Sequence, residues 1–360
     1  MTSATRTAAV MVHPGTIEIR ELPVPEIGAH DVLVEVEAVG VCGSDTHFFE
    51  EGRIGDLVVV EPLVLGHEAA GVILAAGSAV DPARVGQRVA LEPQRTCGRC
   101  TACKRGEYNL CGAVEFFGCP PHDHGAFTDL TVVRSDVAHA VPDGMTAEEA
   151  AMLEPLSVAV AALRKVGMRA GDRVLITGAG PIGLLLAAGA RAFGAVEVVV
   201  SDPEPSRRER ASAWGTDTVV DRLDHEQRLD VDVFIDASGA LPAIREGVRH
   251  CRPGAHVGLV GMGADELRLP FAAVQHAELS IHGVFRYANT WPTAIGLAAR
   301  GRIPLASMVT ARFGLAGTAD ALTEAKRNPA GLKSVVLPGV PGGRLDAASP
   351  PSIHHRRRES

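Results

Sequence analysis

The sequence predicts an α/β protein with two domains, and three observations support this fold class. The chain has 360 residues, a length for which two domains are the natural expectation. Up to about Val141, short apolar or alternating runs are interrupted by glycine and proline, which is typical of a mostly β domain. From Arg173 onward, strand-like and helix-like runs alternate, which favours a parallel, doubly wound sheet.

The composition narrows the classes of function. The net charge of −8 at pH 7 indicates no basic face, so a nucleic-acid partner is not expected. No run is typical of a membrane span, and the first residues lack the apolar core of a secretory signal. We therefore expect a cytoplasmic protein with no membrane partner. In that reducing compartment, seven cysteines with four of them closely spaced favour metal binding over disulfides.

The first domain is expected to span residues 1–153. Its strand-like runs are AAVMV, TIEIREL, DVLVEVEAVGV, AAGVILAAG and RVALEP. From Thr146 the pattern changes, because apolar residues repeat at helical intervals and Thr146 and Glu149 have the spacing of a capping box. This helix marks the transition to the second domain.

The second domain is expected to span residues 154–288. The predicted elements are a strand at Arg173–Thr177, a helix at Pro181–Phe193, a strand at Glu197–Ser201, a helix at Pro205–Trp214 and strands at Asp232–Ile235, His256–Val260 and Ser280–Phe285. Residues 289–338 are expected to return to the first domain. Residues 339–360 have a composition that cannot bury a core and predict a disordered tail.

A glycine-rich loop lies between the first strand and the first helix of the second domain. Gly178 permits a tight turn, Gly180 lets the backbone approach a pyrophosphate, and Gly183 allows close packing of helix on strand. The N-terminus of the helix then offers free N–H groups to phosphates. A glycine-rich structural turn is the alternative, but the flanking strand and helix favour a dinucleotide site.

An acidic residue ends the second strand of this domain. Asp202 stands where a carboxylate binds the ribose hydroxyls of NAD and repels the additional phosphate of NADP. Arg207 and Arg208 weaken this preference, because an arginine accommodates that phosphate. The sequence therefore predicts NAD as the cofactor.

Four cysteines form a closely spaced cluster. Cys97, Cys100, Cys103 and Cys111 have the number and spacing of a closed, structural zinc site, in a lobe at residues 95–113. The alternative is reactive or incidental thiols, which a reducing compartment disfavours.

A second set of metal-ligand types lies nearer the N-terminus. Cys42, His67 and Glu68 offer sulfur, nitrogen and oxygen donors, and catalytic zinc sites take three protein ligands and leave one position open. A cysteine and a distant His-Glu pair are not a local motif. Ser44 and His47 strengthen the interpretation, because a hydroxyl and an imidazole beside the metal form a proton relay.

The chain resembles the zinc-dependent medium-chain alcohol dehydrogenases, and within them the sorbitol (L-iditol 2-) and xylitol dehydrogenases. The resemblance covers residues 8–337 and rests on the stretches CGSDTHFFEEGRIG, PLVLGHEAAG, LEPLSVA, GAGPIGLL and GVFRYANTWP. It implies a GroES-like, mostly β catalytic domain and a Rossmann domain. It also implies one catalytic and one structural zinc, and a homo-oligomer, a tetramer in preference to a dimer.

The resemblance also implies roles for single residues. Glu154 matches a carboxylate near the catalytic zinc that contacts the zinc-bound water or the substrate. Glu68 and Glu154 are the two candidates for the carboxylate that binds zinc in the resting state. Residues that match substrate contacts are Phe48, Glu154, Arg286 and Tyr287, and residues that match cofactor contacts are Ile182, Asp202 and Arg207. Phe48 replaces a tyrosine, so one hydrogen-bond partner for a polyol hydroxyl is lost and the preferred polyol is expected to differ.

These observations predict NAD-dependent oxidation of a polyol at C2 to the 2-ketose. Three alternatives stay open. The first is a zinc dehydrogenase for threonine, butanediol, a cyclitol or a simple alcohol. The second is a zinc-free quinone reductase, which the metal ligands disfavour. The third is a non-catalytic nucleotide-binding protein, which has little need for the whole set of site residues.

Overall fold

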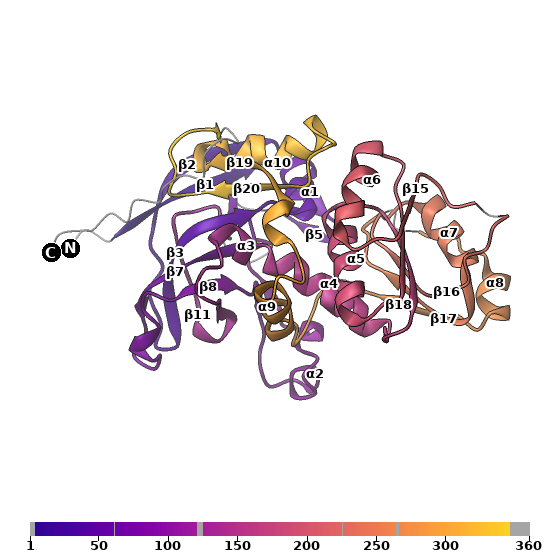
Figure 1. Ribbon diagram of the computed structural model, residues 1–360. Helices are drawn as coiled ribbons and strands as arrows, with labels where there is room; N and C mark the ends of the chain where they lie inside the picture. Colours follow the sequence, from indigo (N-terminus) through magenta and orange to yellow (C-terminus); the bar gives the residue numbers. More distant parts are fainter. Residues whose placement is uncertain (1–3, 61, 121–124, 225, 264–265, 346–360) are drawn as a thin grey trace. The chain divides into compact units, whose positions relative to one another are not determined.

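The computed structural model describes residues 4–60, 62–120, 125–224, 226–263 and 266–345 (Figure 1). The chain divides into two compact units. The described residues up to Glu154, together with those from Leu305, form the first unit, and Pro155–Pro304 form the second. The return to the first unit therefore lies at Leu305 rather than at residue 289.

The position of this return has a local explanation. Helix α9 (Trp291–Ala299) belongs to the second unit, where the side chain of Trp291 is buried. Arg164 of α4 (Leu153–Lys165) donates hydrogen bonds to the Asn289 carbonyl at 2.8 Å and to Thr293 Oγ1 at 2.6 Å. These contacts hold the start of α9 to the second unit.

The first unit is mostly β, as predicted. Its largest sheet has eight described strands in the order β12-β8-β7-β3-β20-β19-β21, and β11 also pairs with β3. These strands are β3 (Asp31–Gly40), β7 (Glu68–Ala76), β8 (Arg88–Leu91), β11 (Leu130–Arg134), β12 (Ala138–Ala140), β19 (Val309–Gly314), β20 (Lys333–Leu337) and β21 (Arg344–Leu345). Figure 1 shows the yellow C-terminal strands beside strands from the first half of the chain.

Smaller elements complete this unit. The remaining strands are β1 (Thr5–His13), β2 (Thr16–Pro23), β4 (Arg53–Ile54), β5 (Leu57–Val58), β6 (Leu63–Val64), β9 (Gln94–Arg95) and β10 (Glu115–Phe116). The helices are α1 (Gly43–Glu51), α2 (Thr101–Lys104), α3 (Ala147–Ala151) and α10 (Thr318–Arg327). Thr146 caps α3 through Glu149 N–H at 3.2 Å, and the Glu149 carboxylate accepts from Thr146 N–H at 2.9 Å, the predicted capping box.

The second unit has the predicted doubly wound fold. Its six described strands are all parallel and run in the order β15-β14-β13-β16-β17-β18, which corresponds to the order 3-2-1-4-5-6 of dinucleotide-binding sheets. They are β13 (Arg173–Thr177), β14 (Glu197–Ser201), β15 (Thr218–Val220), β16 (Val231–Asp236), β17 (Cys251–Leu259) and β18 (Ser280–Gly283). Its other helices are α5 (Pro181–Phe193), α6 (Pro205–Ala211), α7 (Leu241–Arg249) and α8 (Phe271–His276).

The end of the chain differs in part from the expected tail. Arg344 and Leu345 form β21, which pairs with Phe313 and Arg312 of β19, so the stretch from residue 339 contains a short strand. The rest of the predicted tail, residues 346–360, lies outside the described residues. None of the described helices has the length and apolar character needed to cross a bilayer.

Candidate active site and metal centres

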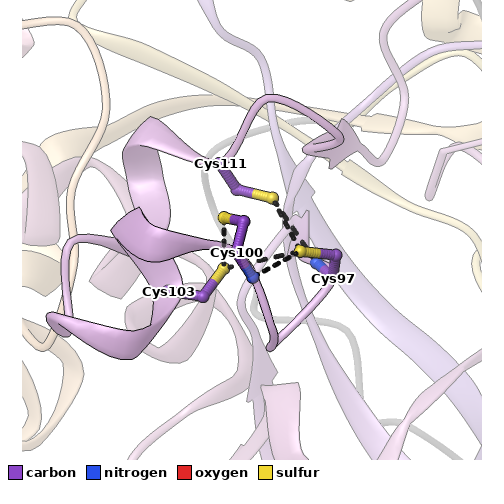
Figure 2. Close-up of side chains that lie close together, drawn as sticks. All are labelled: Cys97, Cys100, Cys103 and Cys111. Atoms are coloured by element: carbon purple, nitrogen blue, oxygen red, sulfur yellow. Dashed lines mark hydrogen bonds between the residues drawn. The ribbon is translucent and has the colours of Figure 1, made fainter.

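The four clustered cysteines lie around helix α2 in the first unit. Their sulfur atoms lie within 4.8 Å of one another, and Figure 2 shows the side chains turned inward. The Sγ atoms of Cys97 and Cys111 are 3.5 Å apart, as are those of Cys100 and Cys103. A tetrahedron with Zn–S bonds of about 2.3 Å has sulfur atoms about 3.8 Å apart, so the cluster fits a closed zinc site.

The backbone of the lobe also favours metal binding. The N–H groups of Arg99 and Cys100 point toward the sulfur of Cys97 and lower the pKa of that thiol to about 6. The thiolate is the form that binds zinc. The loop therefore prepares at least one thiolate at neutral pH before any metal arrives.

The second set of ligands comes together through sheet pairing. Cys42 follows β3 and precedes α1, whereas His67 directly precedes β7 and Glu68 is the first residue of that strand. Strands β3 and β7 are antiparallel, with Gly40 opposite Glu68. One ligand atom from each of Cys42, His67 and Glu68 therefore lies within 4.8 Å of the others.

Two features of this site fit a bound cation. Glu68 Oε2 is buried and has no hydrogen-bond partner among the described residues. A buried carboxylate oxygen without a partner is costly unless a cation binds it. A Cβ atom at Gly40 would lie only 2.2 Å from Glu68 Oε2, so glycine leaves the space that this oxygen occupies.

A fully buried carboxylate, Asp45, supports two of the ligand segments. Its Oδ2 accepts from Cys42 N–H at 2.9 Å, and its Oδ1 accepts from Gly66 N–H at 3.2 Å. The same Oδ1 lies 3.3 Å from His67 Nδ1. Burial alone would lower the pKa of His67, but the charges of Asp45 and Cys42 raise it well above its ordinary value. A carboxylate behind a metal-binding histidine fixes its ring and increases its basicity.

The glycine-rich loop of the second unit has the predicted geometry. Gly178 has a φ of +93°, which favours glycine, and a Cβ at Gly183 would lie 1.8 Å from the Gly178 carbonyl oxygen. Gly180 is the N-cap of α5, and Ile182 lies in the first turn of that helix. The Asp202 carboxylate accepts from Ala179 N–H at 2.7 Å, and Arg207 Nη1 lies 3.9 Å from it. The glycine-rich loop and the end of β14 thus lie side by side, and the contact of this surface with a nucleotide stays a prediction.

Comparison with known proteins supports the assignment of a domain family to each of the two units. Residues 28–143 match the alcohol dehydrogenase GroES-like domain, and residues 181–300 match the zinc-binding dehydrogenase domain. A sorbitol dehydrogenase from Bacillus subtilis is 42% identical over 88% of this chain and 93% of its own length. The chain belongs to the zinc-binding dehydrogenases. Zinc and NAD are the cofactors expected from the sequence; family membership and the cysteine cluster support zinc, and family membership and a similar structure complexed with NADH support NAD.

Further relatives of this dehydrogenase also match it over most of both chains. D-xylulose reductase A from Aspergillus oryzae is 37% identical over 89% of this chain and 93% of its own length. The crystal structure of L-idonate 5-dehydrogenase from Escherichia coli matches with a TM-score of 0.88 at 27% identity, over 93% of this chain and 98% of that one. The predicted family and fold class are confirmed.

Sequence reasoning missed a basic residue of the dehydrogenase, Lys333. It is the first residue of β20, its side chain is buried, and Nζ lies 2.5 Å from Glu68 Oε1. Burial would lower the pKa of Lys333, but the nearby charges of Glu68, Cys42 and Glu154 raise it above its ordinary value. No motif surrounds this lysine, so only the pairing of β20 with β3 could have placed it here.

The other predicted catalytic residues of the first unit differ in exposure. Ser44 is partly exposed and His47 is exposed, and both lie on α1. Glu154 is buried in the first turn of α4 and contributes to the electrostatics of Lys333. Phe48 is only 1% exposed and packs in the hydrophobic core. Its ring therefore serves the core, and the predicted contact of Phe48 with substrate stays a prediction.

Two predicted substrate residues lie in the second unit. The guanidinium of Arg286 stands 5.0 Å from the centre of the Phe285 ring. Tyr287 is buried and makes an edge-to-face contact with Trp291, with ring centres 6.3 Å apart. Their contact with substrate stays a prediction.

Proposed function

We propose that this dehydrogenase oxidises a polyol of the sorbitol (L-iditol) or xylitol type at C2, giving the 2-ketose, with NAD⁺ as hydride acceptor. The observation that carries the proposal is the convergence of Cys42, His67 and Glu68, whose ligand atoms lie within 4.8 Å of one another. An oxygen-containing donor set suits a metal that holds a polyol. The names of the sorbitol and xylulose enzymes among the relatives support the substrate class.

The donor set would hold zinc in the first unit. Cys42 and Glu68 supply negative donors, His67 supplies a nitrogen, and Asp45 orients the imidazole. When bound, zinc supplies Lewis-acid activation of the substrate hydroxyl, and NAD⁺ supplies the hydride acceptor.

The residues of α1 would carry the proton away. Ser44 and His47 are three positions apart on the helix, so their side chains lie on one face. Because His47 is exposed, a proton received from Ser44 reaches solvent through the imidazole. Glu154, buried near Lys333, offers a second route through a water molecule.

We place the protein in the cytoplasm, where four clustered free thiols remain reduced until zinc binds them. We expect a homo-oligomer, a tetramer in preference to a dimer. Sedimentation of the zinc-loaded protein tests this assembly directly.

NADH formation with a panel of polyols and simple alcohols tests the function. The expected result is turnover of sorbitol or xylitol that a chelator abolishes and zinc restores. Turnover of only threonine, butanediol or a simple alcohol would assign a different substrate. A protein that holds zinc but binds no NAD⁺ would contradict the dehydrogenase proposal.

A further inference from the structure

The buried contact between Lys333 and Glu68 divides the two carboxylate oxygens. Lys333 Nζ lies 2.5 Å from Glu68 Oε1 and also donates to the Val41 carbonyl at 2.8 Å. Glu68 Oε2 has no hydrogen-bond partner within the described part of the chain. One oxygen is therefore occupied by a protein cation, and the other is available to a ligand.

The lysine is held firmly relative to the ligand segment. Val335 and Val336 of β20 pair with Gly40 and Val39 of β3. The register continues beyond the strand, because Val41 N–H donates to the Ser334 carbonyl at 3.0 Å. The backbone that carries Lys333 therefore lies directly against the backbone that leads to Cys42.

We propose that Lys333 is a positioning residue that restricts Glu68 to one oxygen donor and so keeps a coordination position of the zinc open for substrate. The inference rests on the proposed function. A zinc-binding carboxylate can present one or both oxygens. Two oxygens from Glu68, together with Cys42 and His67, would supply four donor atoms and close a tetrahedral site.

The charge of the lysine serves the same role. As zinc ligands, Cys42 and Glu68 would bring two negative charges into a largely buried site, and the ammonium group would offset one of them. A buried carboxylate without this partner would turn both oxygens toward the remaining cation. Lys333 thus makes the arrangement with a single oxygen donor the stable one.

Lys333→Met tests the proposal, because methionine has similar reach but neither charge nor N–H donor. Lys326→Met is the matched control, since Lys326 Nζ lies 2.7 Å from Glu50 Oε2 in an ion pair in which the lysine is 69% exposed. The readout is the absorption spectrum of the cobalt-substituted proteins, before and after addition of imidazole. Cobalt at the four cysteines contributes equally to all variants, so difference spectra report the other site.

We expect Lys333→Met to keep its metal, to show the spectrum of a site with one more donor, and to lose the response to imidazole. Its kcat/KM for polyol should fall about 10–100-fold, the range for residues behind metal ligands. Lys326→Met should match the wild type. A Lys333→Met protein with the wild-type spectrum and imidazole response, or one that loses the metal of this site, would overturn the proposal.

Lys333→Arg covers the case in which Lys333→Met does not fold. The arginine keeps the charge and the donor, so we expect the wild-type cobalt spectrum and imidazole response. Loss of either in a folded Lys333→Arg protein contradicts the proposal. The spectra do not depend on turnover, so failure of the wild type to oxidise polyols tests the proposed function separately.

Discussion

The two metal clusters of the first unit are built in opposite ways. Cys97, Cys100, Cys103 and Cys111 come from one continuous segment, and each sulfur has another sulfur as its neighbour. The other cluster joins the segment after β3, the start of β7 and, through Lys333, a strand 265 positions away from Glu68. One local loop brings the four cysteines together, whereas the other cluster depends on the pairing of β3 with β7 and β20.

The surroundings of the ligands differ as well. The cysteine cluster supplies four like donors, which complete a tetrahedron by themselves. In the other cluster, Asp45 stands behind His67 and Lys333 stands behind Glu68. In the site that we propose, these partners would orient three unlike donors and leave one position for a substrate. The two clusters therefore differ in their supporting residues as well as in their ligands, and residues behind a metal's ligands orient and tune them.

Gly40→Ala should have the largest effect on this comparison. The new Cβ would lie 2.2 Å from Glu68 Oε2, so this oxygen must move away from its position. The other oxygen of the carboxylate is held by Lys333, which restricts how the group can move. We expect one zinc per chain to be lost and polyol turnover to fall about 100-fold, at the upper end for residues behind metal ligands. Metal analysis and steady-state kinetics measure both.

Gly43→Ala is the control for this substitution. A Cβ at Gly43 meets no described atom within 4 Å, although the residue directly follows Cys42. It should keep both zincs and near-wild-type turnover. Equal behaviour of the two alanine variants would refute the role of Gly40.

Asp45→Asn should have the next largest effect. An amide keeps the shape but loses the negative charge that faces Cys42 N–H, Gly66 N–H and His67. We expect zinc affinity at this site to fall about tenfold, while the cysteine cluster keeps its zinc. Competition with a chromogenic chelator separates the two sites. A uniform loss of both zincs would show general unfolding instead.

Cys103→Ser should affect stability far more than chemistry. Losing one of four thiolates opens the lobe, because structural zinc supplies the free energy that orders it. We expect faster tryptic cleavage at Arg99, Lys104 or Arg105, with polyol turnover per folded molecule reduced less than about twofold. A collapse of turnover in protein that resists trypsin would assign the cluster a catalytic role.

Alkylation of thiols should give the smallest but most local signal. In zinc-free protein, the Cys97 thiol has a pKa of about 6, whereas burial raises the pKa of Cys251 to about 12. At pH 8 Cys97 is therefore a thiolate and Cys251 is a thiol, and iodoacetamide should modify Cys97 first. Lowering the pH to 5 should slow the reaction of Cys97 about tenfold, because most of the thiolate is then protonated.

Mass spectrometry after brief labelling measures this order. Saturating zinc should protect Cys97 at both pH values. Equal labelling of Cys97 and Cys251 in zinc-free protein would contradict the difference between their environments.

The sequence predicted the features that depend on short spacing. The glycine-rich loop, the capping box at Thr146 and the cysteine cluster were all visible, because their residues are near neighbours in the chain. The βαβ alternation predicted the second unit for the same reason.

The features that spacing could not predict depend on strand pairing. Lys333 reaches Glu68 only because β20 pairs with β3, and Gly40 matters only because β7 places Glu68 opposite it. Asp45 lies between Cys42 and His47 in the sequence, but its contacts with Gly66 and His67 require the folded sheet. Phe48 lies in the core, a position that its spacing did not predict, and the substrate contact that the resemblance implies for it stays a prediction.

The most direct test of the account is zinc content and NAD⁺-dependent polyol oxidation measured on the same preparation of Cys42→Ser. We expect one zinc per chain in place of two, with the cysteine cluster still filled, and turnover reduced by more than about 100-fold. A Cys42→Ser protein that retains full turnover would contradict the assignment of Cys42, His67 and Glu68 as the catalytic metal site.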